Sequence, residues 1–136
     1  MSDRTENLTV LVVEPMRKPQ VREITGDLGS MQAVVGGAIE LVYPFPEDPV
    51  ALICHEEGKL IGLPPNRFLR LKNGQPYDVV CGTFFLAGVE EDRLVSLSRE
   101  QLEKYSSMYS REVLLQVPRD KGPGRNGRRK TDEQFL

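Results

Sequence analysis

Short runs of β-branched and other apolar residues, broken by proline and glycine, constrain the fold of this chain more than any other feature. The first run, residues 8–13, is mostly β-branched and predicts a central strand. Asn-Gly, Pro-Pro and Glu-Glu-Gly turns separate the later runs, which favours antiparallel pairing. Further strands are expected at residues 20–24, 38–43, 50–54, 59–61 and 77–87.

Two segments have the apolar spacing of three and four residues that is typical of an amphipathic helix. The first covers residues 27–35, with Asp27 as its N-cap and a Gly-Gly pair as its stop. The second covers residues 98–109 and begins with the capping-box pair Ser98 and Gln101. We therefore expect an α+β fold with a mostly antiparallel or mixed sheet of about six strands. Two helices are packed on it, and we expect both on one face.

A chain of 136 residues is long enough for one domain with a core of its own. We expect that domain at residues 8–117, after a flexible N-terminus at residues 1–7. Residues 118–136 are rich in Gly, Pro and charge, so they predict a disordered basic tail. The tail from residue 119 has six Lys or Arg and three Asp or Glu, whereas the rest of the chain has twelve and seventeen.

The basic tail suggests weak contact with nucleic acid through phosphate groups, lost at high salt. The residues that would make this contact are Arg125, Arg128, Arg129 and Lys130. The alternative is a tail that only increases solubility, since nearby acidic residues dilute its charge.

The composition points to a cytoplasmic protein without a metal or cofactor. No apolar run is long enough to cross a bilayer, and the polar start of the chain does not resemble a secretory signal. Cys54 and Cys81 lie in apolar segments and are expected as free, buried thiols, with a disulfide between neighbouring strands as the alternative. One histidine and two separated cysteines are too few for a zinc cluster.

Residues 55–67 contain the candidate binding residues. Glu56, Glu57 and Lys59 surround a glycine and suggest a charged tip that touches a partner or ligand; the alternative is a solvated hairpin turn. Two prolines then fix the backbone before Asn66 and Arg67, so these side chains are held in place for recognition of an amide, carboxylate or phosphate.

Structural explanations compete with recognition at the same positions. Asn66 can cap a helical turn, and Arg67 can pair with an acidic neighbour such as Glu40. His55 beside an acidic residue suggests acid–base chemistry, but no nucleophile motif accompanies it. Phe84 and Phe85 are expected in the core, because their segment is apolar on both faces.

Four stretches together resemble a small domain family of unknown function. They are VGGAIELVYPF, HEEGKLIGLPPNRFL, YDVVCGTFFLAG and LSREQLEKY, which lie in this order between residues 35 and 105. Members of that family occur mostly in phages, plasmids and conjugative elements of Gram-positive gut bacteria, and some occur near anti-defence genes. The resemblance implies a small accessory protein. The family pattern often has Asn where this chain has His55, which argues against an essential catalytic base there.

Three functions follow as hypotheses. The first is a non-catalytic binding module of a mobile element, which engages a host protein or sequesters a small anionic ligand through His55, Glu56, Glu57, Lys59, Asn66 and Arg67. The second is a nucleic-acid-associated protein that uses its basic tail. The third is a small enzyme that brings together His55, Glu56 and Arg67. Exposed edge strands would also permit a homodimer.

Overall fold

The computed structural model describes residues 6–114, which form eight strands and two helices. Six strands build one sheet in the order β2-β1-β7-β4-β3, with β8 paired to β7, and the other two form a separate hairpin. The strands are β1 (Asn7–Val13), β2 (Gln20–Thr25), β3 (Ile39–Val42), β4 (Val50–His55), β5 (Pro65–Arg70), β6 (Pro76–Cys81), β7 (Phe84–Glu90) and β8 (Arg93–Val95). Every pairing is antiparallel, as the turn pattern predicts.

The three central strands are apolar on both faces because both faces of the main sheet are covered. In β7, Phe84 and Leu86 belong to the core on one face, while Phe85 and Ala87 belong to the core on the other. Strands β1 and β4 alternate in the same way. Phe84 and Phe85 are both fully buried, which confirms the prediction that they are core residues.

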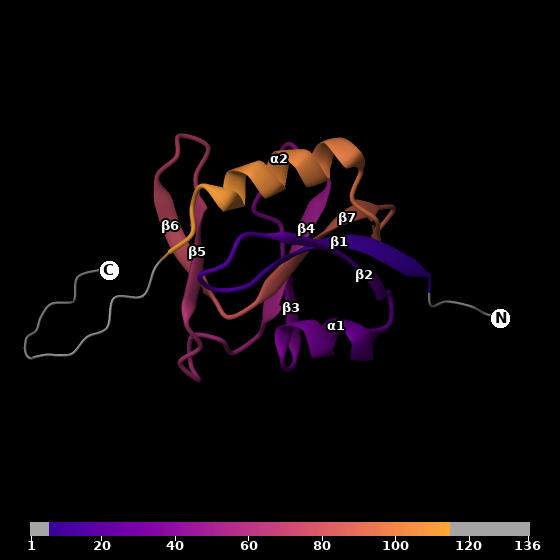
Figure 1. The fold of residues 1–136 in the computed structure, drawn as a ribbon, viewed down its shortest axis with the longest axis horizontal. Helices are drawn as coiled ribbons and strands as arrows, with labels where there is room; N and C mark the ends of the chain where they lie inside the picture. Colours follow the sequence, from indigo (N-terminus) through magenta and orange to yellow (C-terminus); the bar gives the residue numbers. More distant parts are fainter. Residues whose placement is uncertain (1–5, 115–136) are drawn as a thin grey trace, which may run out of the picture.

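The two helices cover opposite faces of the sheet (Figure 1). Helix α1 (Leu28–Val35) has Asp27 as its N-cap and ends at Gly36, whose φ of 87° is left-handed. Helix α2 (Arg99–Ser110) begins with the predicted capping box. The caps are confirmed, but the expectation of both helices on one face is wrong. Alternating apolar residues in the central strands create two apolar faces, and each face needs a cover.

The β5–β6 hairpin packs beside α2 on one face of the main sheet. Leu69 from β5 and Val80 from β6 join the core under α2 (Figure 1). The expected strand at residues 77–87 is in fact two strands that belong to different sheets. Gly82 separates them with a φ of 90°, which lets the chain turn from the hairpin into β7.

Residues 59–61 form a turn and not the predicted strand. Strand β4 pairs with β3 and β7 instead, so its two edges are already occupied. The predicted flexible N-terminus lies largely outside the described residues, and the predicted tail lies wholly outside them.

Candidate functional site

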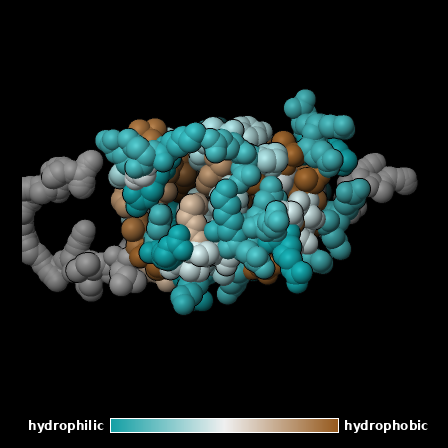
Figure 2. All heavy atoms as spheres, turned by 90° about the horizontal axis from the view of Figure 1, so that it is seen from above, coloured by the Kyte–Doolittle hydropathy of each residue, from teal (hydrophilic) through white to brown (hydrophobic). Residues whose placement is uncertain are grey.

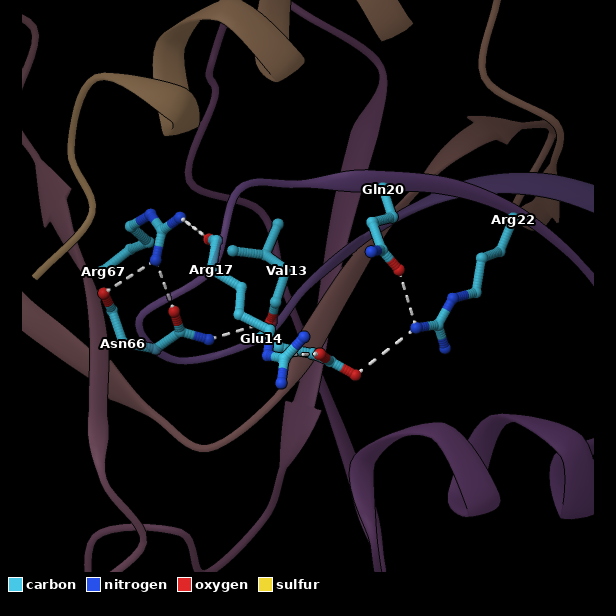
Figure 3. A network of polar contacts seen from close by, with 7 residues as sticks. All are labelled: Val13, Glu14, Arg17, Gln20, Arg22, Asn66 and Arg67. Atoms are coloured by element: carbon cyan, nitrogen blue, oxygen red, sulfur yellow. Dashed lines mark hydrogen bonds and ion pairs between the residues drawn. The ribbon is translucent and has the colours of Figure 1, made fainter.

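Asn66 and Arg67 lie at the start of β5, and both side chains are fully buried. The Asn66 amide donates to the Val13 carbonyl and to the Gly82 carbonyl, each at 2.9 Å. Its Oδ1 accepts a hydrogen bond from Arg67 Nη1 at 2.7 Å. Asn66 therefore connects the end of β1, the start of β5 and the turn before β7 (Figure 3).

Among the described residues, the Arg67 guanidinium binds backbone carbonyl groups and the side-chain oxygen of Asn66, and no carboxylate. Its Nε donates to the Tyr109 carbonyl at 3.0 Å, its Nη1 to the Asn66 carbonyl at 3.2 Å, and its Nη2 to the Arg17 carbonyl at 2.6 Å. Burial lowers the pKa of Arg67, although it is an arginine and remains charged. A buried charge is tolerated only when it is well hydrogen-bonded, and this network supplies the acceptors.

This placement differs from both interpretations of the sequence. A recognition site would have presented Asn66 and Arg67 to a partner. Instead, their polar groups point into the protein and bind other residues of this chain. The alternative pairing of Arg67 with Glu40 is also absent from the described residues, where the acceptors of Arg67 are oxygens of Asn66, Arg17 and Tyr109. The pair joins β5, the β1–β2 turn and the end of α2.

The network continues to the surface through the β1–β2 turn. The Arg17 side chain pairs with Glu14 at 3.6 Å, and Arg22 reaches Glu14 at 3.4 Å and Gln20 at 2.9 Å (Figure 3). These outer contacts are exposed, so they add little to stability. The buried half of the network is what holds the hairpin against the rest of the domain.

Residues 56–63, called the 56–63 loop below, connect β4 to β5 and have a fixed backbone. Ile61 N–H donates to the Glu57 carbonyl at 3.0 Å, and Leu63 N–H donates to the Gly58 carbonyl at 2.9 Å. Gly58 lies so close to β6 that an added Cβ would be 2.5 Å from the Cys81 carbonyl oxygen. The Leu63 side chain packs where a Cβ on Gly82 would stand, at 2.6 Å. The loop is therefore held against the hairpin on two sides.

Lys59 provides a further attachment, since its ammonium group pairs with the Asp78 carboxylate of β6. The hydrogen bond with Asp78 raises the pKa of Lys59. Burial acts to raise the pKa of Asp78, but the hydrogen bonds from Lys59 and from the Val79 N–H outweigh it, so this pKa is lowered.

Beside this ion pair lies a cavity of about 240 Å³ that brings together the predicted residues His55, Glu56, Glu57 and Lys59. The cavity is acidic, because Glu40 and Asp78 also line it and Lys59 is the one Lys or Arg among the described residues that line it. Asn66 and Arg67 do not line it. The structure therefore gathers four of the six predicted residues and places the other two elsewhere.

Two large apolar side chains at the tip of the 56–63 loop point into solvent. Leu60 is 84% exposed and Ile61 is 55% exposed, and Leu60 has the highest value among the exposed large apolar residues of the described chain. Sequence reasoning missed them because it assigned residues 59–61 to a strand. The available signal was two consecutive aliphatic residues enclosed by Gly58 and Gly62, the latter with a φ of 76°.

His55 has a structural role in the turn. Its Nδ1 accepts a hydrogen bond from the Glu57 N–H at 3.0 Å, and its Nε2 lies where a Cβ on Gly37 would stand, at 2.5 Å. Within residues 6–114, no hydrogen bond or ion pair joins Arg67 to His55 or Glu56. The convergence that the enzyme hypothesis requires is therefore not found in the described chain.

Cys54 and Cys81 are free thiols, as expected, but they are partly buried and not fully buried as predicted, because both line the acidic cavity. Burial, and then the negative charge of Glu40, raises the pKa of Cys54 to about 11. Burial likewise raises the pKa of Cys81. A thiol is nucleophilic only as the thiolate, so neither has the character of a catalytic cysteine.

The predicted nucleic-acid residues Arg125, Arg128, Arg129 and Lys130 lie outside the described residues. In the part of the chain that the structure describes, no group of three or more His, Cys, Asp or Glu side chains is arranged to hold a metal ion. No described helix is both long enough and apolar enough to cross a membrane.

Comparison with known proteins gives one match. Residues 8–110 match the family described as Domain of unknown function (DUF3846), a range that contains all ten helices and strands apart from the first residue of β1. No curated protein and no solved structure matches the chain. Because the match covers most of the 136 residues, the chain belongs to this family of domains of unknown function.

Proposed function

We propose that this protein is a non-catalytic binding module that engages another protein through the 56–63 loop. The observation that carries the proposal is the exposure of Leu60 and Ile61 on a loop whose backbone is already fixed. Burying such a side chain against a partner contributes about 1.5–3 kcal/mol. Because the loop is ordered before binding, little of that gain is offset by ordering the backbone.

The charges around the tip define the kind of partner. Glu56 and Glu57 lie four and three residues before Leu60, and the acidic cavity lies beside the tip. The partner surface is therefore an apolar pocket with a basic rim. Charges of opposite sign at the rim increase the association rate, while the two aliphatic side chains supply most of the affinity.

A protein partner is better supported than a small anionic ligand. Glu40, Glu56, Glu57 and Asp78 surround the cavity, and the ammonium group of Lys59 is already engaged by Asp78. An anion placed there would meet four carboxylates of like charge. Of the two ligands that the sequence suggested, we therefore retain the protein.

We further propose that the protein acts in the cytoplasm as an accessory protein of a phage, plasmid or conjugative element, with a host protein as its partner. The resemblance of the sequence to proteins of such elements supports the biological setting. The two free thiols support a reducing compartment.

The test compares binding by two double variants of the full chain. In Leu60→Ser/Ile61→Ser the apolar tip is lost, whereas in Leu28→Ser/Tyr43→Ser two other exposed apolar side chains are lost from the surface. A host protein that the wild type and the control variant retain, but the tip variant releases, supports the proposal. Equal retention by the tip variant and the wild type contradicts it.

A further inference from the structure

A second surface, separate from the 56–63 loop, is an apolar groove of about 300 Å³ on the face covered by α2. Three parts of the chain form its walls: the proline-rich connection after β3, strand β5 with its turn, and α2. We call it the α2 groove. Figure 2 views the molecule from the side of α2. Hydrophobic surface is visible there between hydrophilic side chains, mostly toward the end of the molecule with the β5–β6 hairpin. The apolar residues that line the groove include Phe45, Phe68, Leu71, Tyr105 and Met108.

Aromatic rings give the groove a rigid floor. The rings of Phe45 and Tyr105 pack against each other at a tilt of 45°, with their centroids 4.6 Å apart, and the Tyr105 hydroxyl binds the Asp48 carboxylate. Arg70 lies over the Phe68 ring at 5.6 Å from its centroid. These contacts hold the rings in place, so an incoming apolar side chain would meet a preformed surface.

Three ion pairs surround the groove. Lys72 and Glu47 are almost equally exposed, at 78% and 73%, while in the other two pairs the basic side chain is the more exposed. Lys104 pairs with Asp48 at 2.8 Å, and the lysine side chain is 61% exposed while the aspartate is 25% exposed. Arg70 pairs with Glu112 at 3.2 Å, and again the basic partner is the more exposed, at 37% against 24%. Lys72 pairs with Glu47. The fitting occupant is therefore an apolar or aromatic side chain preceded or followed by acidic residues.

We propose that residues 132–136 of the same chain, Asp-Glu-Gln-Phe-Leu, occupy the α2 groove. Phe135 is the one aromatic residue between positions 115 and 136. It lies against the aromatic rings of the groove, while Asp132 and Glu133 face the exposed charges of Arg70 and Lys104. The inference is independent of the function proposed for the 56–63 loop.

The position where the described chain ends supports this occupant. Glu112 lines the groove, and the description ends two residues later at Leu114. The 17 residues at positions 115–131 then span about 25 Å if they behave as a flexible linker, so the segment can return to the groove. Such a tether gives an effective concentration in the millimolar range, and a weak intrinsic affinity is enough for occupancy.

Charge favours the same arrangement along the linker. Residues 6–114 have sixteen Asp or Glu and eleven Lys or Arg, whereas residues 115–131 have six basic residues and one acidic residue. A basic linker that crosses an acidic domain is attracted to it, and this attraction weakens as salt screens it.

Methyl NMR of methionine in the full chain tests the proposal, because Met108 lines the groove while Met31 packs on the opposite face. In Phe135→Ala the Met108 methyl resonance is expected to shift, since the ring current of Phe135 is lost, and Met31 stays unchanged. Gln134→Ala is the matched control and leaves both resonances in place. Asp132→Asn/Glu133→Gln is expected to shift Met108 part of the way toward its position in Phe135→Ala.

Two results would overturn the proposal. One is a Met108 resonance that is the same in the wild type and in Phe135→Ala. The other is a shift that appears only as protein concentration rises, because the groove would then bind the segment of a second copy. An unchanged Met31 resonance in each variant shows that the domain is still folded, so neither result can be mistaken for a failure to fold.

Discussion

Oδ1 of Asn66 accepts a hydrogen bond from Nη1 of its sequence neighbour Arg67 at 2.7 Å, and both side chains are completely buried. Adjacent residues in a regular strand point to opposite faces. Here the β5–β6 register shifts between Pro65 and Arg67, and this irregularity turns the two side chains toward each other. Asn66 and Arg67, whose residue types suggest a binding motif, thus hold the β5–β6 hairpin to the rest of the domain.

Removal of the Asn66 amide is expected to destabilise the protein strongly. Asn66→Ala leaves the Val13 and Gly82 carbonyls without their donor and Arg67 without one acceptor, at a cost of about 2–4 kcal/mol. Asn73→Ala, in the exposed β5–β6 turn, is the control and is expected to cost less than about 1 kcal/mol. Urea unfolding of the two variants measures both values. Equal losses of stability would show that the buried hydrogen bonds of Asn66 contribute no more to stability than the exposed hydrogen bond of Asn73.

A methyl group on Gly82 is expected to displace the Leu63 side chain, which holds the 56–63 loop against the hairpin, and so to lower the stability of the protein. In Gly82→Ala the new Cβ would lie 2.6 Å from Leu63 Cδ1 at a φ of 90°, whereas Gly74 has a similar φ of 92° and nothing within 4 Å. Both alanine variants carry the same backbone strain, so the difference between them isolates the clash. Gly82→Ala should be less stable than Gly74→Ala by about 1–3 kcal/mol. If the two variants unfold at the same urea concentration, Leu63 is not a rigid anchor.

Both thiols are expected to react slowly. Since burial raises the pKa of Cys54 to about 11 from an ordinary 9.0, its thiolate fraction at pH 8 falls about a hundredfold. Alkylation by iodoacetamide, followed by mass spectrometry of Cys54→Ser and Cys81→Ser, gives the rate for each remaining thiol. The urea-unfolded protein supplies the reference rate. Native rates close to this reference would contradict the buried environment.

The ionisation of Asp48 is expected to make the free energy of unfolding depend on pH in the acid range. Hydrogen bonds from Lys104 and then from Tyr105 lower the pKa of Asp48, so its charged form is favoured in the folded state. This stabilisation is fully present above the ordinary aspartate pKa, near 3.9, and is lost as pH falls through the lowered value. Asp48→Asn should therefore show a weaker loss of stability below about pH 4 than the wild type. A wild-type slope in Asp48→Asn would show that Asp48 does not link stability to pH in this range.

The sequence predicts local features of this fold better than long-range ones. The caps at Asp27 and Ser98 were predictable because each depends on residues within one helical turn. That the two helices cover opposite faces of the sheet was not predictable, because it depends on which strands become neighbours. The division of the run 77–87 at Gly82 was also missed, because apolar residues continue on both sides of Gly82, although only β7 is a buried strand and β6 is mostly exposed.

The candidate site shows the same limit. His55, Glu56, Glu57 and Lys59 were expected to act together, and they line one cavity because they are close in sequence. Asn66 and Arg67 have the side chains of a recognition motif, but their partners come from β1, the β1–β2 turn, the turn before β7 and α2. Polar residue type indicates hydrogen-bonding capacity, and only the fold decides whether the partner is another molecule or the protein itself.

The central claim, that the tip of the 56–63 loop contacts another protein, is tested most directly by site-specific photo-crosslinking. A benzophenone amino acid is placed at Leu60 in one sample and at Tyr43, which is also exposed, in another. Irradiation of the full chain in host extract is expected to give one discrete protein adduct from position 60 and none of that mass from position 43. The same adduct from both positions, or none from position 60 while the partner remains bound, would contradict the claim.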